Sequence, residues 1–198
     1  MYTSDLNYKK ATQAINYIAS QQRNNIVNKM KAIKLIWLAD RYHIRKYGRP
    51  VIGDYYLAME NGPVGSIVRD IANAATAYLE PEELEYRNMY LKADGKYSIK
   101  SINHLDDDVF SDTDIEALTF VLENFGKMNE FELVELSHKY PEWARFEEQL
   151  KYASRQSMSY KDFFLDPTNI SDDKFRQNEK LTDAAKEIFL EESSVICG

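Results

Sequence analysis

Hydrophobic positions recur at helical spacing along most of this chain of 198 residues. A first amphipathic helix, over about residues 7–21, is predicted from the apolar positions Leu6, Ala11, Ala14, Ile15 and Ile18. A second helix is predicted from Asn28, a favourable N-cap, to Tyr47, because Gly48 favours a helix end and Pro50 blocks continuation. This second helix carries apolar residues on nearly its whole circumference, which is typical of a central helix.

The polar residues of the second helix divide into two groups. Four basic residues gather in one stripe, which we expect to form a solvated or protein-facing surface: Lys31, Lys34, Arg41 and Arg45. Asp40 projects among apolar neighbours instead, so its carboxylate should be at least partly buried and should need a hydrogen-bond partner. The candidate partners are Arg41, Tyr55 and Tyr56.

The remaining pattern predicts short strands and further helices. Residues 54–60 alternate as a strand does, Asn61-Gly62 turns the chain, and Pro63 fits the first position of the next helix. Asp94-Gly95 predicts a hairpin between residues 89–93 and 96–100, which we expect to join the 54–60 strand in one small sheet. Later helices are predicted to begin at Ser111 and Asn129 and to cover about residues 143–152 and 171–192.

These elements predict a mainly α fold with a small antiparallel β-sheet, an α+β class. We expect a compact helical domain with a β-hairpin insertion over residues 1–152, and a C-terminal helical extension over residues 153–198 that packs on the same domain. No apolar stretch reaches the roughly 20 residues of a membrane-spanning helix, and the first residues do not resemble a secretory signal. A cytoplasmic protein is therefore expected.

Charge is distributed unevenly about the net value of -7. Residues 1–50 hold ten Lys or Arg and two Asp or Glu, whereas the rest hold fifteen and thirty. Either the two regions neutralise each other within one fold, or residues 1–50 present a basic face to an acidic partner. A pI near 5.1 argues against a strong nucleic-acid footprint.

Candidate chemistry is sparse. Cys197 is the single cysteine, and His43, His104 and His138 lie in separate elements, so we expect neither a metal nor a cofactor, even where His104 precedes three aspartates. The sequence has no nucleophile elbow, phosphate loop or metalloprotease pair. Asp40 and His43 could form an acid–base pair, but residues at this spacing on a helix more often build a structural network.

Five blocks of sequence, in order and at consistent spacing, resemble one known family. They are residues 34–54, residues 56–64 with the Gly-Pro-Val turn, and residues 111–118, 131–138 and 141–143. Together they resemble the Panacea, or SocA-like, antitoxin domain, whose members are mostly helical with a small sheet and are often phage-associated. The resemblance implies a non-enzymatic antitoxin that neutralises a toxin encoded beside it. Some members bind the toxin directly, and the SocA type also delivers its toxin to a Clp protease.

The expected site residues lie in the blocks of residues 34–54 and 56–64 that carry the resemblance, or next to them. The predicted structural polar network and turn consist of Asp40, Asp54, Tyr56, Gly62 and Pro63. The side chains expected to contact the toxin partner are Arg41, Arg45, Tyr55 and Asn61. Two alternatives stay open: a small hydrolase or ligand-binding enzyme around Asp40 and His43, and a DNA-binding autoregulator of its own operon.

Overall fold

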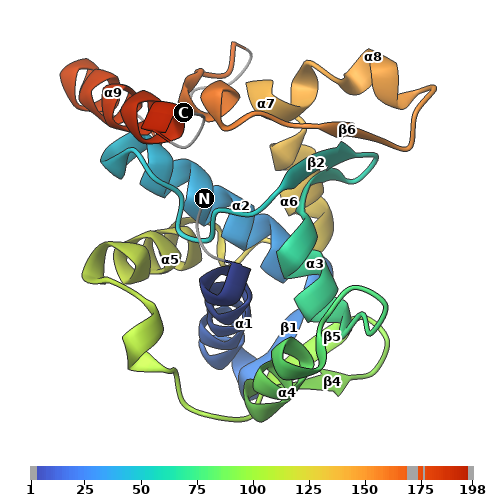
Figure 1. Cartoon of the computed structure of the whole chain (residues 1–198). Helices are drawn as coiled ribbons and strands as arrows, with labels where there is room; N and C mark the ends of the chain where they lie inside the picture. Colours follow the sequence, from blue (N-terminus) through green and yellow to red (C-terminus); the bar gives the residue numbers. More distant parts are fainter. Residues whose placement is uncertain (1–3, 169–173, 176, 196–198) are drawn as a thin grey trace.

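Helix α2 (Lys29–Tyr47) runs through the middle of the protein in the computed structural model, which describes residues 4–168, 174–175 and 177–195 (Figure 1). Residues 32 to 45 are all buried, as expected of a helix that is apolar on nearly all sides. The Asn28 side chain accepts hydrogen bonds from two N–H groups of the first turn, and Gly48 ends the helix with a φ of 75°. Both predicted ends of this helix are confirmed.

The other helices surround α2, and the fold is mainly helical, as predicted. Helices α1, α3, α5, α6 and α9 pack directly against it. None of the helices in the described part of the chain combines the length and the apolar composition that a bilayer crossing requires. The bounds are α1 (Ser4–Ser20), α3 (Ser66–Asn73), α4 (Pro81–Tyr90), α5 (Asp112–Phe125), α6 (Glu130–Ser137), α7 (Pro141–Ala144), α8 (Glu147–Leu150) and α9 (Glu179–Val195).

Two small antiparallel sheets complete the described structure. One has the order β1-β5-β4 and the other the order β3-β2-β6. In Figure 1, the first lies beside α4 at one end of the molecule, and the second lies nearer to α9 at the opposite end. The bounds are β1 (Ile26–Asn28), β2 (Tyr56–Met59), β3 (Gly62–Gly65), β4 (Leu91–Asp94), β5 (Ser98–Ser101) and β6 (Arg155–Ser157).

The predicted hairpin around Asp94-Gly95 is confirmed as β4 and β5, but its predicted sheet partner is wrong. Strand β5 pairs with β1, with Val27 opposite Ile99, and not with the strand of residues 54–60. Three residues carry too little alternation to reveal a strand, so β1 gave no sequence signal. The described part of the chain therefore forms two sheets where one was predicted.

The segment around Pro63 also differs from the prediction. Pro63 lies in β3, opposite Ala58 of β2, and α3 begins only at Ser66. The first turn of α3 is capped by a distant residue: the Asp54 carboxylate accepts hydrogen bonds from the N–H groups of Ile67 and Val68, both at 2.9 Å. Because this cap comes from another segment, the local sequence did not show where the helix starts.

The C-terminal region of the chain packs on the same core as the rest. Strand β6 pairs with β2, and both α9 and the short 3-10 helix η3 (Tyr160–Phe164) contact α2. The predicted helix over residues 143–152 is instead the two short helices α7 and α8. The last helix starts at Glu179, later than predicted, and residues 171–173 of that prediction lie outside the described residues. The proposed boundary near residue 152 stays a prediction.

Candidate functional site

Asp40 holds together the chain that leaves α2 and returns as β2. Its carboxylate is fully buried: Oδ1 accepts hydrogen bonds from the N–H groups of Val51 and Ile52, both at 2.9 Å. Oδ2 accepts one from the hydroxyl of Tyr56 at 3.0 Å, so one of the three partners considered from the sequence takes this role. Burial raises the pKa of Asp40 to about 7, against the opposing effect of these hydrogen bonds.

Asp54 has a similar role in the segment that follows. Besides capping α3, its Oδ1 accepts a hydrogen bond from the N–H group of Tyr55 at 2.6 Å. Burial raises the pKa of Asp54 to about 6. A Cβ at Gly65 would collide with the Asp54 carboxylate, so glycine is required for this close approach. The two carboxylates thus fix both ends of the segment from residue 51 to residue 68.

Arg41 and Arg45, two of the four predicted partner contacts, lie inside the protein. Arg41 is fully buried and donates hydrogen bonds from Nη1 to Glu142 at 2.8 Å and from Nη2 to the carbonyl of Leu165 at 2.8 Å. Arg45 donates to the carbonyl of Phe163 at 3.2 Å and pairs with Asp166. Both guanidinium groups therefore fasten the C-terminal segment to α2, and a partner that touches the surface of this conformation would not reach them.

The expectation that the basic stripe of α2 forms a surface is wrong for three of its four residues. Lys34, Arg41 and Arg45 are 1%, 0% and 3% exposed, and only Lys31 is half-buried. The periodicity showed which residues share one side of α2, but segments from the far end of the chain cover that side. Buried cations require partners, and here carbonyl oxygens and a buried carboxylate provide them.

Tyr55 and Asn61, the other two predicted partner contacts, are exposed but belong to different surfaces. Tyr55 is 58% exposed, and its hydroxyl donates a hydrogen bond to Ser157 of β6 at 2.8 Å. Asn61 is exposed in the turn between β2 and β3 and lines a groove on the protein surface. Contact of Tyr55 and Asn61 with a partner stays a prediction, and Asn61 would make it as part of the groove.

The buried side chains of Asp40 and His43 both bond to the loop that follows α2. His43 Nδ1 lies 2.6 Å from the carbonyl oxygen of Arg49, and Nε2 lies 3.0 Å from the hydroxyl of Thr113. Burial lowers the pKa of His43 to about 4, which favours the neutral ring. Because both side chains are 0% exposed and both hold the loop that follows α2, the geometry favours structural roles for them.

Metal binding finds no support in the described part of the chain. His104 and the neighbouring aspartates do not come together with other ligand types there, since no group of three or more His, Cys, Asp or Glu side chains could hold an ion among those residues. Cys197 lies outside the described residues.

The groove that Asn61 lines is a feature that sequence reasoning missed. Its volume is about 740 Å³, and it opens to solvent where five segments meet: the start of α2, the β2–β3 hairpin, α3, the β4–β5 turn and the start of α6. Its lining residues are Asn28, Lys29, Met30, Ile33, Lys34, Met59, Asn61, Val64, Arg69, Asn73, Lys96, Tyr97, Glu130 and Phe131. The β4–β5 hairpin was predicted, whereas the β2–β3 hairpin was not, because Pro63 was expected to start a helix. No local pattern could show that both hairpins border one groove.

Lys34 reaches this groove from the core side and explains the neighbouring glycine. Its Nζ donates a hydrogen bond to the carbonyl of Pro63 at 2.7 Å, and burial lowers the pKa of Lys34 to about 7. Gly62 has a φ of 90°, and a Cβ there would lie 2.8 Å from Lys34 Nζ and would also collide with the hydroxyl of Ser137. Gly62 therefore meets two demands that only glycine satisfies.

Residues 33–144 match the family model of the antitoxin SocA-like, Panacea domain. This stretch covers more than half of the chain and includes Asp40, Asp54, the Gly62-Pro63 turn and helices α3 to α7. No curated protein and no solved structure shows a significant match to the chain. The resemblance noted from the sequence is therefore confirmed over these residues, and the chain belongs to the SocA-like Panacea antitoxin domain family.

Proposed function

We propose that this protein is an antitoxin that neutralises its toxin by binding it directly. The observation that carries the proposal is the family match over residues 33–144, because membership of an antitoxin family supports an antitoxin role and implies a toxin partner in general. Neutralisation by direct binding goes beyond what family membership implies.

The interior of the protein suits a pre-formed binding surface. The carboxylates of Asp40 and Asp54 accept hydrogen bonds from five backbone N–H groups, counting only contacts within the described residues, and Asp40 also accepts one from the hydroxyl of Tyr56. They thereby hold the exposed β2–β3 turn on a fixed base. A surface that is already ordered loses less conformational entropy on binding, which favours affinity. This supports a rigid protein-binding role for the segment.

Co-expression with the toxin encoded in the neighbouring reading frame tests the proposal. We expect growth to be restored, the toxin to remain at its original abundance, and the two proteins to purify together. Continued growth arrest without a complex would refute the antitoxin role. Restored growth with loss of the toxin in a protease-dependent manner would replace direct binding by delivery to a protease.

A double variant, Asp40→Asn with His43→Gln, separates binding from catalysis. Both replacements keep hydrogen-bonding groups in place but remove the acid and the base, so a binding protein should rescue growth as the unchanged protein does. Loss of rescue by a variant that is folded and still binds the toxin would favour an enzyme.

A further inference from the structure

The surface groove exposes large aromatic side chains that have no packing role in the core. Phe131, in the first turn of α6, is 68% exposed, and Tyr97, in the β4–β5 turn, is 66% exposed. Met30 and Met59 add flexible apolar surface, and most of the surface area that the groove exposes is apolar. Exposed aromatic rings gathered at a concave site are typical of protein-binding surfaces, where they bury much area on association.

The charge of the groove is opposite in sign to that of the whole protein. Three of its lining residues carry a positive charge at neutral pH, namely Lys29, Arg69 and Lys96, whereas Glu130 is the one acidic residue among those lining it. Lys34 also lines the groove, but burial lowers its pKa to about 7. The chain as a whole carries a net charge of -7. Because charges beyond roughly 8 Å are largely screened at physiological salt, these nearby cations decide which partner is attracted.

Two of these cations, Lys29 and Lys96, are available to a partner's carboxylates. Within the described residues no ion pair joins either of them to a carboxylate, whereas Arg69 pairs with Asp70 at 2.8 Å. Glu130 already accepts a hydrogen bond from Asn28 at 3.0 Å. Lys96 lies 5.1 Å from the centre of the Tyr97 ring, so a cation and an aromatic face are presented together.

We propose that this groove is the toxin-binding site and that it takes an acidic segment of the toxin that also carries aromatic or aliphatic anchors. The inference rests on the proposed function and adds to it the surface and the chemistry of the segment bound. The exposed rings of Phe131 and Tyr97 receive the anchors, and Lys29 and Lys96 pair with the carboxylates. A volume of about 740 Å³ accommodates a few side chains, comparable to a ligand pocket.

The sequence had offered two interpretations of the basic residues 1–50, neutralisation within the fold or a basic face. The structure divides these residues between both. Arg41 pairs with Glu142 inside the fold, and Lys10 and the partly exposed Arg49 pair with the buried Asp114. Lys29 lines the groove instead, whereas Lys34 is buried and hydrogen-bonds to the carbonyl of Pro63.

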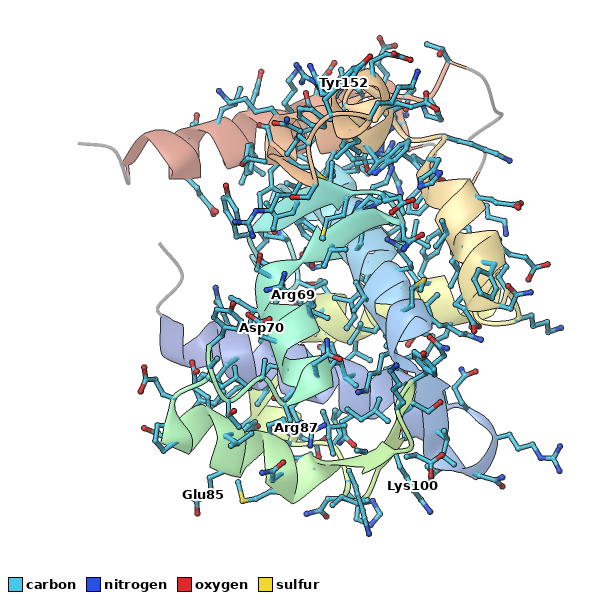
Figure 2. The ribbon with its side chains drawn as sticks, turned by 90° about the vertical axis from the view of Figure 1, so that its right-hand side faces the viewer. Arg69, Asp70, Glu85, Arg87, Lys100 and Tyr152 are labelled. Atoms are coloured by element: carbon cyan, nitrogen blue, oxygen red, sulfur yellow. The ribbon has the colours of Figure 1, made fainter. Side chains whose placement is uncertain are left out.

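Matched variants test the groove against the rest of the surface. Lys96→Glu in the groove has a partner in Lys92→Glu, which makes the same charge change on the same hairpin but outside the groove lining. Phe131→Ala is matched by Tyr152→Ala, which removes a ring that is 91% exposed. Figure 2 shows Tyr152 at one end of the molecule, well away from Arg69 of the groove.

The measurement is the dissociation constant of the purified toxin for each variant, by titration calorimetry, with the thermal midpoint as a check on folding. We expect Lys96→Glu and Phe131→Ala each to weaken binding about tenfold or more, as central interface residues do, and the two controls to change it less than about threefold. A synthetic peptide of the toxin's most acidic segment should compete for the site.

The outcomes separate the two proposals. If the unchanged protein binds the toxin but both groove variants bind equally well, the groove assignment is overturned and the antitoxin proposal stands. Equal weakening by groove and control variants also overturns the groove assignment. If the unchanged protein does not bind the toxin at all, direct binding fails and the groove assignment fails with it.

Discussion

Replacing Asp40 by Asn should make the stability of this protein less sensitive to pH. The folded pKa of Asp40 is about 7, whereas the ordinary value is 3.8, because burial disfavours the charged form. A raised folded pKa means that the folded state holds the proton more tightly than the unfolded state. The stability that the protonated group contributes is therefore fully present below pH 3.8 and is lost as the pH rises through 7.

The size of the effect follows from the shift in pKa. A difference of about three pKa units corresponds to about 4 kcal/mol in the free energy of unfolding between acidic and alkaline pH. Asn cannot ionise, yet its carbonyl oxygen can accept the hydrogen bonds of Val51 and Ile52, and its amide can donate to the hydroxyl of Tyr56. We therefore expect the stability of Asp40→Asn to gain about 4 kcal/mol relative to the unchanged protein between about pH 4 and about pH 8.

Urea unfolding at several pH values, followed by tryptophan fluorescence, measures this difference. Trp37 and Trp143 are 0% and 4% exposed, so unfolding changes the surroundings of both. Asp40→Ala serves as a second variant. It cannot ionise either, but it leaves three buried donors without an acceptor, so it should be about 3 kcal/mol or more less stable than Asp40→Asn at every pH. If the difference between Asp40→Asn and the unchanged protein stayed constant across that pH range, Asp40 would not have a raised pKa in the folded protein.

Three further substitutions test other features of the account. Gly62→Ala forces a strained φ and a collision with Ser137, so the free energy of unfolding should fall by more than about 2 kcal/mol in urea unfolding; an unchanged midpoint would contradict the close approach. Arg41→Met leaves the buried Glu142 without its cation, so the free energy of unfolding should fall by about 3–5 kcal/mol in the same measurement. A fall below about 1 kcal/mol would argue against the buried pair. Lys34→Met removes a desolvated ammonium together with its hydrogen bond to Pro63, so the free energy of unfolding should change by less than about 1 kcal/mol. Toxin binding should weaken about tenfold, because the β2–β3 hairpin beside the groove loses its anchor. Equal losses in the free energies of unfolding and of toxin binding would indicate a purely structural lysine.

Local sequence features account for the elements that were predicted well. Asn28 and Gly48 set the two ends of α2, because each acts on the residues next to it in the chain. Asp94-Gly95 forms a tight turn by its local preference alone. The N-caps Ser111 and Asn129 likewise form capping boxes with residues three positions later. All of these signals are complete within a few residues of sequence.

The errors at Arg41, at Pro63 and at the groove share one cause, which is contact between distant segments. Arg41 is buried because Glu142 and the carbonyl of Leu165, both far along the chain, satisfy its guanidinium group. Pro63 lies in a strand because β2 pairs with it, and α3 starts later because Asp54 caps it. The groove was missed for the same reason, since its five segments meet only in the folded chain.

Inhibition of the purified toxin by this purified protein is the decisive test of neutralisation by binding. If the protein neutralises its toxin by binding, toxin activity should fall in proportion to the protein added, in the absence of any protease or nucleotide, and should vanish near a fixed molar ratio. The two proteins should also sediment as one complex. Full toxin activity with excess protein, and two separately sedimenting species, would contradict the account.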